Sequence, residues 1–262
     1  MKDKTPFAAP FQPPHAKLDK HLERMRHRGY GGGFITRHRS LLFSPHNPAK
    51  MIPAFLLTVA FLLGWWLLRE VVCRYWSVML DFWAGAIGLQ GGVAVVPYRL
   101  FDLIPFSIPF LNVGAGPPGD LTWWMGMIFT ALLIPISFLI PRRYLPLAYM
   151  LRITAFFQGT AQFFFGFWRD GFPYEAGGYI HGMLIASWML IAVLPIVLGF
   201  TYFIFDFSLS RKVALALMIM GHQTVLVPMQ YVMQAYVIHH GSLLFLPLCF
   251  FLSSLPLNVI IF

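Results

Sequence analysis

The sequence predicts an all-α integral membrane protein with about five or six transmembrane helices, an amphipathic helix at the membrane interface and long tilted helices near the C-terminus. Hydrophobic residues make up 58% of the 262 residues and charged residues only 11%, and the mean hydropathy is +0.68. A soluble domain carries roughly 25% charged residues. The chain divides into a basic polar N-terminal arm, residues 1–50, and a membrane domain, residues 51–262.

The N-terminal arm is rich in Pro, His, Arg and Lys and holds much of the formal charge of +9. It lacks the apolar stretch of a secretory signal peptide. Its composition is compatible with an organellar presequence, with an arm that lies on a membrane or a partner subunit, and equally with a solvated tail. The histidines of the arm are irregularly spaced, a pattern that does not favour a metal site.

The membrane domain begins with an uncharged span, residues 51–68, followed by a different kind of helix. Residues 71–88 carry Trp76 and Trp83 among charged side chains, which predicts an amphipathic helix that lies along the interface. The following segment, residues 90–120, contains five prolines, which forbid one continuous helix. We therefore expect an apolar segment there, either surface-lying or re-entrant, that packs against other protein.

The remaining apolar runs predict further spans that are joined by short turns. They cover residues 121–140, 144–168, 179–205, 213–238 and 242–262. Two of the turns carry basic pairs, Arg142–Arg143 and Arg211–Lys212. Basic residues collect on the cytoplasmic or matrix side of a membrane. We therefore expect both turns, and the basic arm, to face that side.

Arg152 carries the strongest functional signal, because it lies within the otherwise apolar span 144–168. A guanidinium keeps its charge, since its pKa exceeds ~12, and placing it near a bilayer centre costs at least ~2.5 kcal/mol. Arg152 therefore needs an anionic partner, a cage of carbonyl groups or a wet cavity. We interpret it as functional; the alternative is an arginine that reaches back to the interface or pairs with an acid on another helix.

A few other ionisable residues lie inside or beside the spans, and together they could form a protonatable path from one membrane face towards Arg152. They are His181, His222, His239, Asp170 and Glu175. Histidines and carboxylates exchange protons near neutral pH when their surroundings shift the pKa. The alternative for each histidine is an ordinary hydrogen-bonded core or interface residue.

Five glutamines on the apolar helices predict either a polar seam or simple hydrogen bonds between helices. They are Gln158, Gln162, Gln223, Gln230 and Gln234. The two cysteines, Cys73 and Cys249, are far apart and imply neither a disulfide framework nor a metal site. We find no nucleophile–base pair typical of a hydrolase and no basis for nucleic-acid binding.

Four short segments, in this order, resemble subunit a of F-type ATP synthases, the proton-channel subunit. Leu100–Phe106 resembles the Asn-Leu-x-Gly-x-x-Pro segment of that family, and Pro117–Thr122 resembles the proline and threonine before the following span. Leu145–Ile153 is similar to its Pro-x-Ser-Leu-x-x-Arg-Leu helix, whose arginine is essential. Met233–Val237 contains the Gln-Ala-Tyr-Val of its last long helix.

The resemblance implies a divergent subunit a, since the family's Asn and Gly-His after the arginine are replaced by Phe156 and Gly159–Thr160. Arg152 would attract the ionised carboxylate of a rotor ring and separate two proton half-channels. Gln234 and the ionisable residues named above would line the proton path. The implied partners are the rotor c-ring, other ATP synthase membrane-sector subunits and the lipid bilayer, with cardiolipin as a candidate lipid.

The resemblance also implies a location in the mitochondrial inner membrane, or alternatively a bacterial plasma membrane. It implies no cofactor, no metal and no catalytic chemistry in this chain itself, which would act as part of a proton-translocating ATP synthase complex.

Two other classes of function stay open. Leu151–Ile153 followed by Gly178–His181 is similar to the arginine and histidine motifs of exosortase-type membrane transpeptidases. That family needs a cysteine at the start of the preceding span, where this chain has Asp120–Thr122, and the chemistry fails without the thiolate. The other class is a non-catalytic scaffold subunit of a respiratory complex. A carboxylate-bearing rotor ring found in stoichiometric association with the chain would distinguish the first reading from both.

Overall fold

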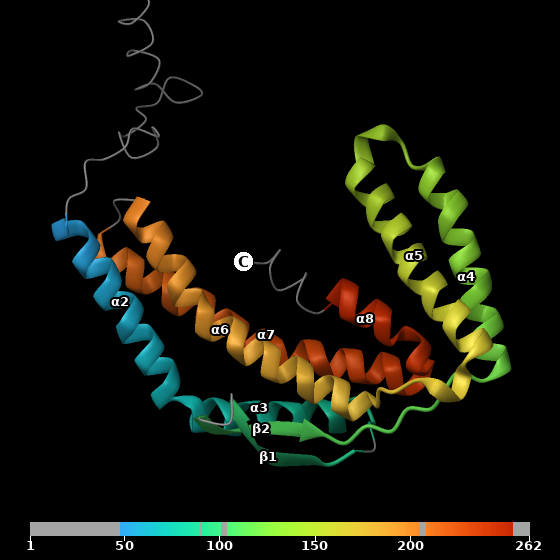
Figure 1. Cartoon of the computed structure of the whole chain (residues 1–262), viewed down its shortest axis with the longest axis horizontal. Helices are drawn as coiled ribbons and strands as arrows, with labels where there is room; N and C mark the ends of the chain where they lie inside the picture. Colours follow the sequence, from blue (N-terminus) through green and yellow to red (C-terminus); the bar gives the residue numbers. More distant parts are fainter. Residues whose placement is uncertain (1–47, 90, 101–103, 205–207, 254–262) are drawn as a thin grey trace, which may run out of the picture.

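The computed structural model describes residues 48–89, 91–100, 104–204 and 208–253, so the polar arm predicted for residues 1–50 lies almost wholly outside the described residues. The described part is mostly helical, as predicted, and forms two arms of a V (Figure 1). Helices α2, α6 and α7 form one arm and helices α4 and α5 the other, with the short helix α8 between them. The helices are α2 (Pro48–Leu67), α3 (Arg69–Ala86), α4 (Asp120–Leu139), α5 (Leu145–Phe167), α6 (Ala176–Ile204), α7 (Leu209–Gly241) and α8 (Leu246–Ser253).

Helices α2 and α3 meet at Leu68 with a bend of 57°. Helix α2 has no charge in its apolar part, whereas α3 is amphipathic, as the sequence predicts for residues 71–88. Its buried face consists of Val72, Cys73, Trp76, Leu80 and Ala84, which are spaced at helical intervals. The chain leaves α3 through Gly88, whose φ of +72° lies in the left-handed region that glycine adopts without a steric cost.

The segment after α3 differs from the all-α expectation, because it contains a β-hairpin. Strands β1 (Val93–Leu100) and β2 (Ile104–Leu111) pair antiparallel, with Val93 opposite Leu111. The prolines exclude a helix, as predicted, but they are compatible with a two-stranded sheet, in which both strands are edges. Alternate residues of β2, including Phe106 and Ile108, point into the core.

Helices α4 and α5 form a tight antiparallel hairpin. They are joined through a 3-10 turn, η2 (Arg142–Tyr144). The close approach of the two helices depends on small residues: a Cβ added at Gly126 of α4 would overlap the amide nitrogen of Gln162 in α5. At the other end of the hairpin, Trp123 Nε1 donates a hydrogen bond to the Gln162 carbonyl over 3.0 Å.

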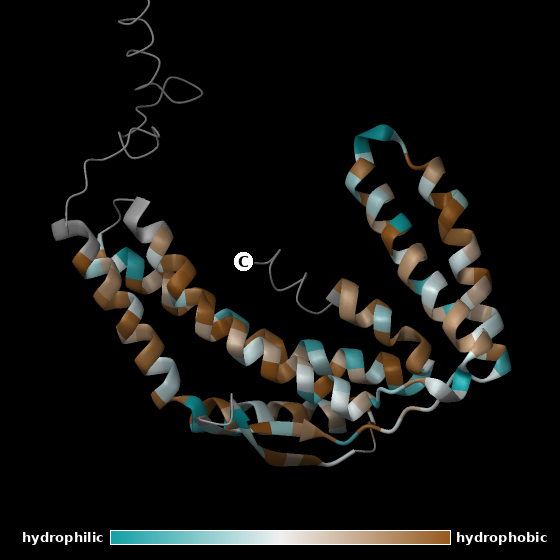
Figure 2. Ribbon diagram, in the orientation of Figure 1, coloured by the Kyte–Doolittle hydropathy of each residue, from teal (hydrophilic) through white to brown (hydrophobic). Residues whose placement is uncertain are grey.

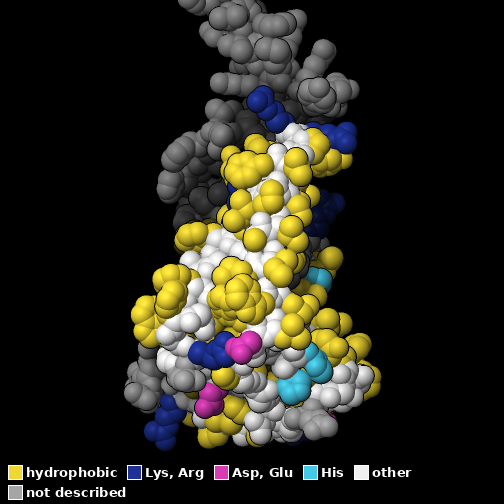
Figure 3. Space-filling model, turned by 90° about the vertical axis from the view of Figure 1, so that its right-hand side faces the viewer, with side chains coloured by type: hydrophobic (Ala, Val, Ile, Leu, Met, Phe, Trp, Pro, Cys, Tyr) yellow, Lys and Arg dark blue, Asp and Glu magenta, His cyan; other side chains and the backbone are white. Residues whose placement is uncertain are grey.

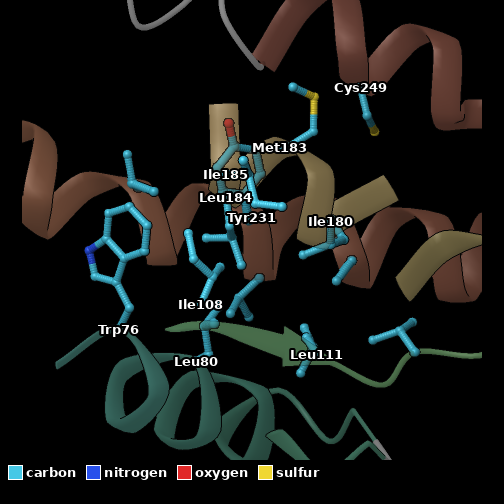
Figure 4. Close-up of a cluster of buried hydrophobic side chains, with 14 of the residues drawn as sticks. Trp76, Leu80, Ile108, Leu111, Ile180, Met183, Leu184, Ile185, Tyr231 and Cys249 are labelled. Carbon is cyan, nitrogen blue, oxygen red and sulfur yellow. The ribbon is translucent and has the colours of Figure 1, made fainter. Parts of the chain in front are cut away.

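The main core lies where α3, β2, α6 and α7 meet. Trp76 and Leu80 of α3 and Ile108 of β2 point towards Leu184 of α6 and Tyr231 of α7 (Figure 4). All five side chains are almost completely buried. Trp76 Nε1 also donates to the Thr224 carbonyl of α7 over 2.9 Å. This core ties the amphipathic helix and the hairpin to α6 and α7, so these elements form one packed unit.

Three described helices, α4, α6 and α7, are long and apolar enough to cross a membrane, and the bent pair α2–α3 would add a fourth. Figure 2 shows hydrophobic residues all along α4 and α6 and a hydrophilic turn between α4 and α5. Helix α5 is not among these candidates, although it packs along α4. Of the span predicted at 242–262, the structure describes only η4 (Leu243–Phe245) and α8, and the rest lies outside the described residues.

Charged residues divide between the two ends of the V. The end that we call the basic end carries Arg142, Arg143, Arg211 and Lys212, at the turn before α5 and the start of α7 (Figure 1). Every acidic residue in the described ranges lies at the other end, which we call the base: it comprises α3, the β-hairpin, residues 112–119, the start of α4 and residues 168–175. The base also carries four arginines, Arg69, Arg74, Arg99 and Arg169. The two basic turns therefore lie on one side, as the sequence predicts.

Candidate functional site

Polar side chains gather at the base, where α6 begins and α7 ends. Because the two helices run antiparallel, the first turns of α6 meet the last turns of α7. Tyr179 of α6 donates a hydrogen bond from its hydroxyl to Oε1 of Gln234 in α7 over 2.9 Å. Gln234 is buried, so this bond satisfies an amide oxygen that water cannot reach freely.

His181 lies one half-turn beyond Tyr179 and faces the β-hairpin. Its Nδ1 donates to the Pro109 carbonyl over 3.2 Å, and its ring centroid lies 5.6 Å from that of Phe110. A carbonyl accepts but cannot donate, so this contact places the proton on Nδ1. In the neutral ring Nε2 is then the basic nitrogen.

His239 lies near the end of α7 and contacts the segment that follows the β-hairpin. Its Nδ1 donates to the Gly114 carbonyl over 2.7 Å, and its ring is exposed. The neighbouring His240 ring lies 4.4 Å from the Tyr236 ring. Figure 3 shows histidine side chains at the base, beside a hydrophobic surface. His239 and His240 thus form an exposed titratable rim.

The two predicted acidic residues belong to residues 168–175, at the base. Glu175 is exposed immediately before α6, and its backbone carbonyl accepts the first-turn hydrogen bond from the Tyr179 amide over 2.9 Å. Asp170 lies in η3 (Arg169–Gly171), and its side chain lies outside the described part. Next to it, Arg169 pairs with Asp120 across 2.9 Å and connects the start of α4 to the end of α5.

Arg152 lies in the second turn of α5, about 10 Å along the helix at 1.5 Å per residue. Its Nε donates to Ser137 Oγ over 3.4 Å, and its guanidinium carbon lies 4.4 Å from the centroid of Phe138 and 5.5 Å from that of Tyr149. Cation–π contacts of this kind contribute about 0.5–2 kcal/mol. No carboxylate of the described residues lies within salt-bridge distance of Arg152.

Four of the predicted residues, Gln234, His181, His239 and Glu175, lie at the base, and Arg152 lies apart from them. Tyr179, which was not predicted, connects Gln234 to the start of α6, close in sequence to His181 and Glu175. Arg152 is level with the last turn of α4, towards the basic end, whereas these residues lie at the base. His222 is exposed on α7, about 18 Å along the helix from Gln234.

The five glutamines, for which the sequence predicts either a polar seam or simple hydrogen bonds between helices, divide between two helices. Gln223, Gln230 and Gln234 are buried on α7, whereas Gln158 and Gln162 are buried on α5 in the α4–α5 hairpin. Ser137, the hydrogen-bond partner of Arg152, was also not predicted. Its position follows from antiparallel pairing across a short turn, because residues at equal distances from that turn face each other. This pairing is the signal in the sequence that could have found it.

Among the described residues, no group of three or more His, Cys, Asp or Glu side chains is arranged to hold a metal ion. Comparison with known proteins adds no assignment. No family model, no curated protein and no solved structure matches this chain.

Proposed function

We propose that this chain is the proton-translocating stator subunit of an ATP synthase membrane sector, with Arg152 separating two half-channels against a rotor ring. One observation carries the proposal: Arg152 lies in α5, which packs along the apolar helix α4, and has no carboxylate partner in the described part of the chain. Ionisable residues inside membranes are normally paired or line a polar pathway. A carboxylate on another subunit would supply the missing anion.

The proposed mechanism follows from the charge of Arg152. An ionised rotor carboxylate is attracted to the guanidinium, and it is released towards lipid once a proton from one half-channel neutralises it. The same fixed positive charge repels protons, because a guanidinium does not lose its own proton near neutral pH. Protons are thereby prevented from leaking directly between the two half-channels.

The positions of the polar groups fit half-channels that open to opposite faces. His181, His239, Glu175 and the Tyr179–Gln234 pair lie at the base, and three of these side chains are titratable. Arg152 lies towards the basic end. We propose that the base residues, with Asp170 and His222, line the half-channel that opens on the side of the base.

We further propose that the chain crosses the membrane five or six times, with α3 at the interface. Helix α7 has 33 residues and is about 50 Å long, which exceeds a hydrocarbon core of ~30 Å. It must therefore tilt or extend beyond the bilayer. The basic end would face the matrix or cytoplasm, and the membrane would be the mitochondrial inner membrane or alternatively a bacterial plasma membrane.

The test is ATP-driven proton pumping in membranes that carry Arg152→Ala or Arg152→Lys, with assembly checked by native gel. Arg143→Ala, an exposed arginine at the tip of the same hairpin, is the matched control. We expect an assembled complex without pumping for Arg152→Ala and normal pumping for Arg143→Ala. Unchanged pumping in assembled Arg152→Ala complexes would exclude the stator role.

One observation favours a scaffold subunit instead, namely that Ser137, Phe138 and Tyr149 already surround the guanidinium of Arg152. Purification of the chain without a rotor ring would support that alternative. The transpeptidase alternative requires Arg152 and His181 to share one site with a thiolate. Arg152 lies in the second turn of α5, near the basic end, whereas His181 lies near the start of α6, at the base, and Cys73 and Cys249 are both buried.

A further inference from the structure

Two glutamine side chains of α5 are completely or almost completely buried and have no hydrogen-bond partner. Gln158 is 0% exposed and Gln162 is 1% exposed. Neither the amide nitrogen nor the amide oxygen of either side chain has a hydrogen-bond partner. Buried polar groups in proteins are almost always hydrogen-bonded, because an unsatisfied one loses its hydration without compensation. These amides therefore indicate a ligand.

Burial restricts the ligand to a small molecule. Side chains that are 0% and 1% exposed cannot be reached by a helix of a partner subunit. Each amide offers both a donor and an acceptor and carries no net charge, so the matching ligand is neutral and can both donate and accept. Water has this chemistry, and bound waters typically make about three hydrogen bonds to buried polar groups that otherwise lack partners.

The seam around the two glutamines is lined by small residues. A Cβ added at Gly159, beside Gln158, would meet only the Thr130 methyl group, at 3.8 Å. Ala155 and Ala161 of α5 are buried nearby on the same helix. The side chains of α5 are therefore small at the level where the two amides lie.

We propose that the α4–α5 seam binds water at Gln158 and Gln162. Polar side chains continue from this site towards the basic end: Thr154 precedes Gln158 by one turn and is buried, and Ser137 of α4 contacts Arg152. Side chains four residues apart on a helix lie about 5–6 Å apart, a spacing that single waters bridge. The bound water therefore extends a row of polar groups from the two glutamines towards Arg152. This site follows from burial and pairing alone and does not rest on the proposed function.

The site is tested by radiolytic footprinting of the intact protein in lipid nanodiscs. X-rays convert bound water to hydroxyl radicals in place, and these radicals oxidise adjacent side chains even when they are buried. Leu244 reports on the site, because its Cδ2 and the Gln162 amide meet at the same point beside Gly126. Leu184 is the control, since both leucines are 0% exposed and belong to the same hydrophobic cluster, and Leu184 lies beside Ile108 and Tyr231 (Figure 4).

We expect Leu244 to be oxidised several times faster than Leu184 under X-rays. Hydroxyl radicals made in the bulk from peroxide should label neither residue. Equal X-ray labelling of Leu244 and Leu184 would overturn the proposal. So would labelling of Leu244 by bulk radicals at its X-ray rate, because local opening would then explain it.

Variants add a second readout. Gln158→Leu combined with Gln162→Leu should reduce the labelling of Leu244 to that of Leu184, whereas Phe165→Leu, an apolar change on the same buried face of α5, should not. Persistence of fast Leu244 labelling in a folded double variant would contradict the proposal. If the double variant does not fold, the comparison of the two leucines in the unchanged protein still decides the question.

Discussion

Tyr179 and Gln234 form a hydrogen bond across the α6–α7 contact, with the tyrosine hydroxyl 2.9 Å from the amide oxygen. Removing the hydroxyl with Tyr179→Phe should lower the free energy of unfolding by about 1 kcal/mol. A double-mutant cycle with Gln234→Leu, read from thermal unfolding in detergent, should give a coupling of about 0.5–1.5 kcal/mol. A coupling near zero would show that the pair does not hold the two helices together.

Gly91 and Gly92 are adjacent glycines before β1, and we expect only Gly92 to tolerate substitution by alanine. A Cβ added at Gly91 would overlap the Asn112 carbonyl oxygen, whereas one added at Gly92 meets nothing within 4 Å. The backbone must shift to relieve the first clash, so Gly91→Ala should lower stability by about 1–3 kcal/mol. Gly92→Ala is the matched control and should be nearly neutral. Equal unfolding midpoints for the two variants would contradict this packing of the hairpin.

Trp76 and Trp124 provide a second matched pair. Trp76 is 0% exposed and donates to the Thr224 carbonyl, whereas Trp124 is 59% exposed. Trp76→Phe removes this hydrogen bond and leaves a cavity between α3 and α7, so it should cost about 2–4 kcal/mol. Trp124→Phe should change the thermal midpoint little. A small effect of Trp76→Phe would argue that α3 is not docked on α7.

The ion pair between Arg169 and Asp120 should contribute little to stability. Its atoms are 2.9 Å apart, but the side chains are 39% and 84% exposed, so water and salt screen the attraction. Asp120→Asn should therefore change the free energy of unfolding by no more than about 1 kcal/mol. The effect should shrink further at high salt, which chemical unfolding at two ionic strengths can measure. A larger, salt-independent loss would indicate a buried role for Asp120.

The main features of the helical fold could be predicted from the sequence, because they depend on local patterns. Long uncharged runs predict α4 and α6, and helical spacing predicts the buried face of α3. Proline density correctly excludes a helix from the segment after α3. The β-hairpin itself could not be predicted, because strand pairing depends on a register between Val93 and Leu111 that no single segment encodes.

The candidate site was predictable only in part. Arg152, Gln234 and the histidines stand out as polar residues in apolar surroundings, and this contrast is visible in the sequence. The Tyr179 contact and the division of the glutamines between α5 and α7 are not visible, since both depend on which helices pack together. The position of Arg152 towards the basic end, apart from the base residues, is likewise a consequence of packing.

By itself, the sequence determined that the chain is a mostly helical protein with several apolar helices and basic turns on one side, because hydrophobicity and helical periodicity act over a few turns. Only the tertiary structure decided which polar side chains lie next to one another. It joins Tyr179 to Gln234 and buries Gln158 and Gln162 on α5. The physical reason is that burial and hydrogen bonding depend on contacts between segments far apart in the chain, which local residue patterns do not specify.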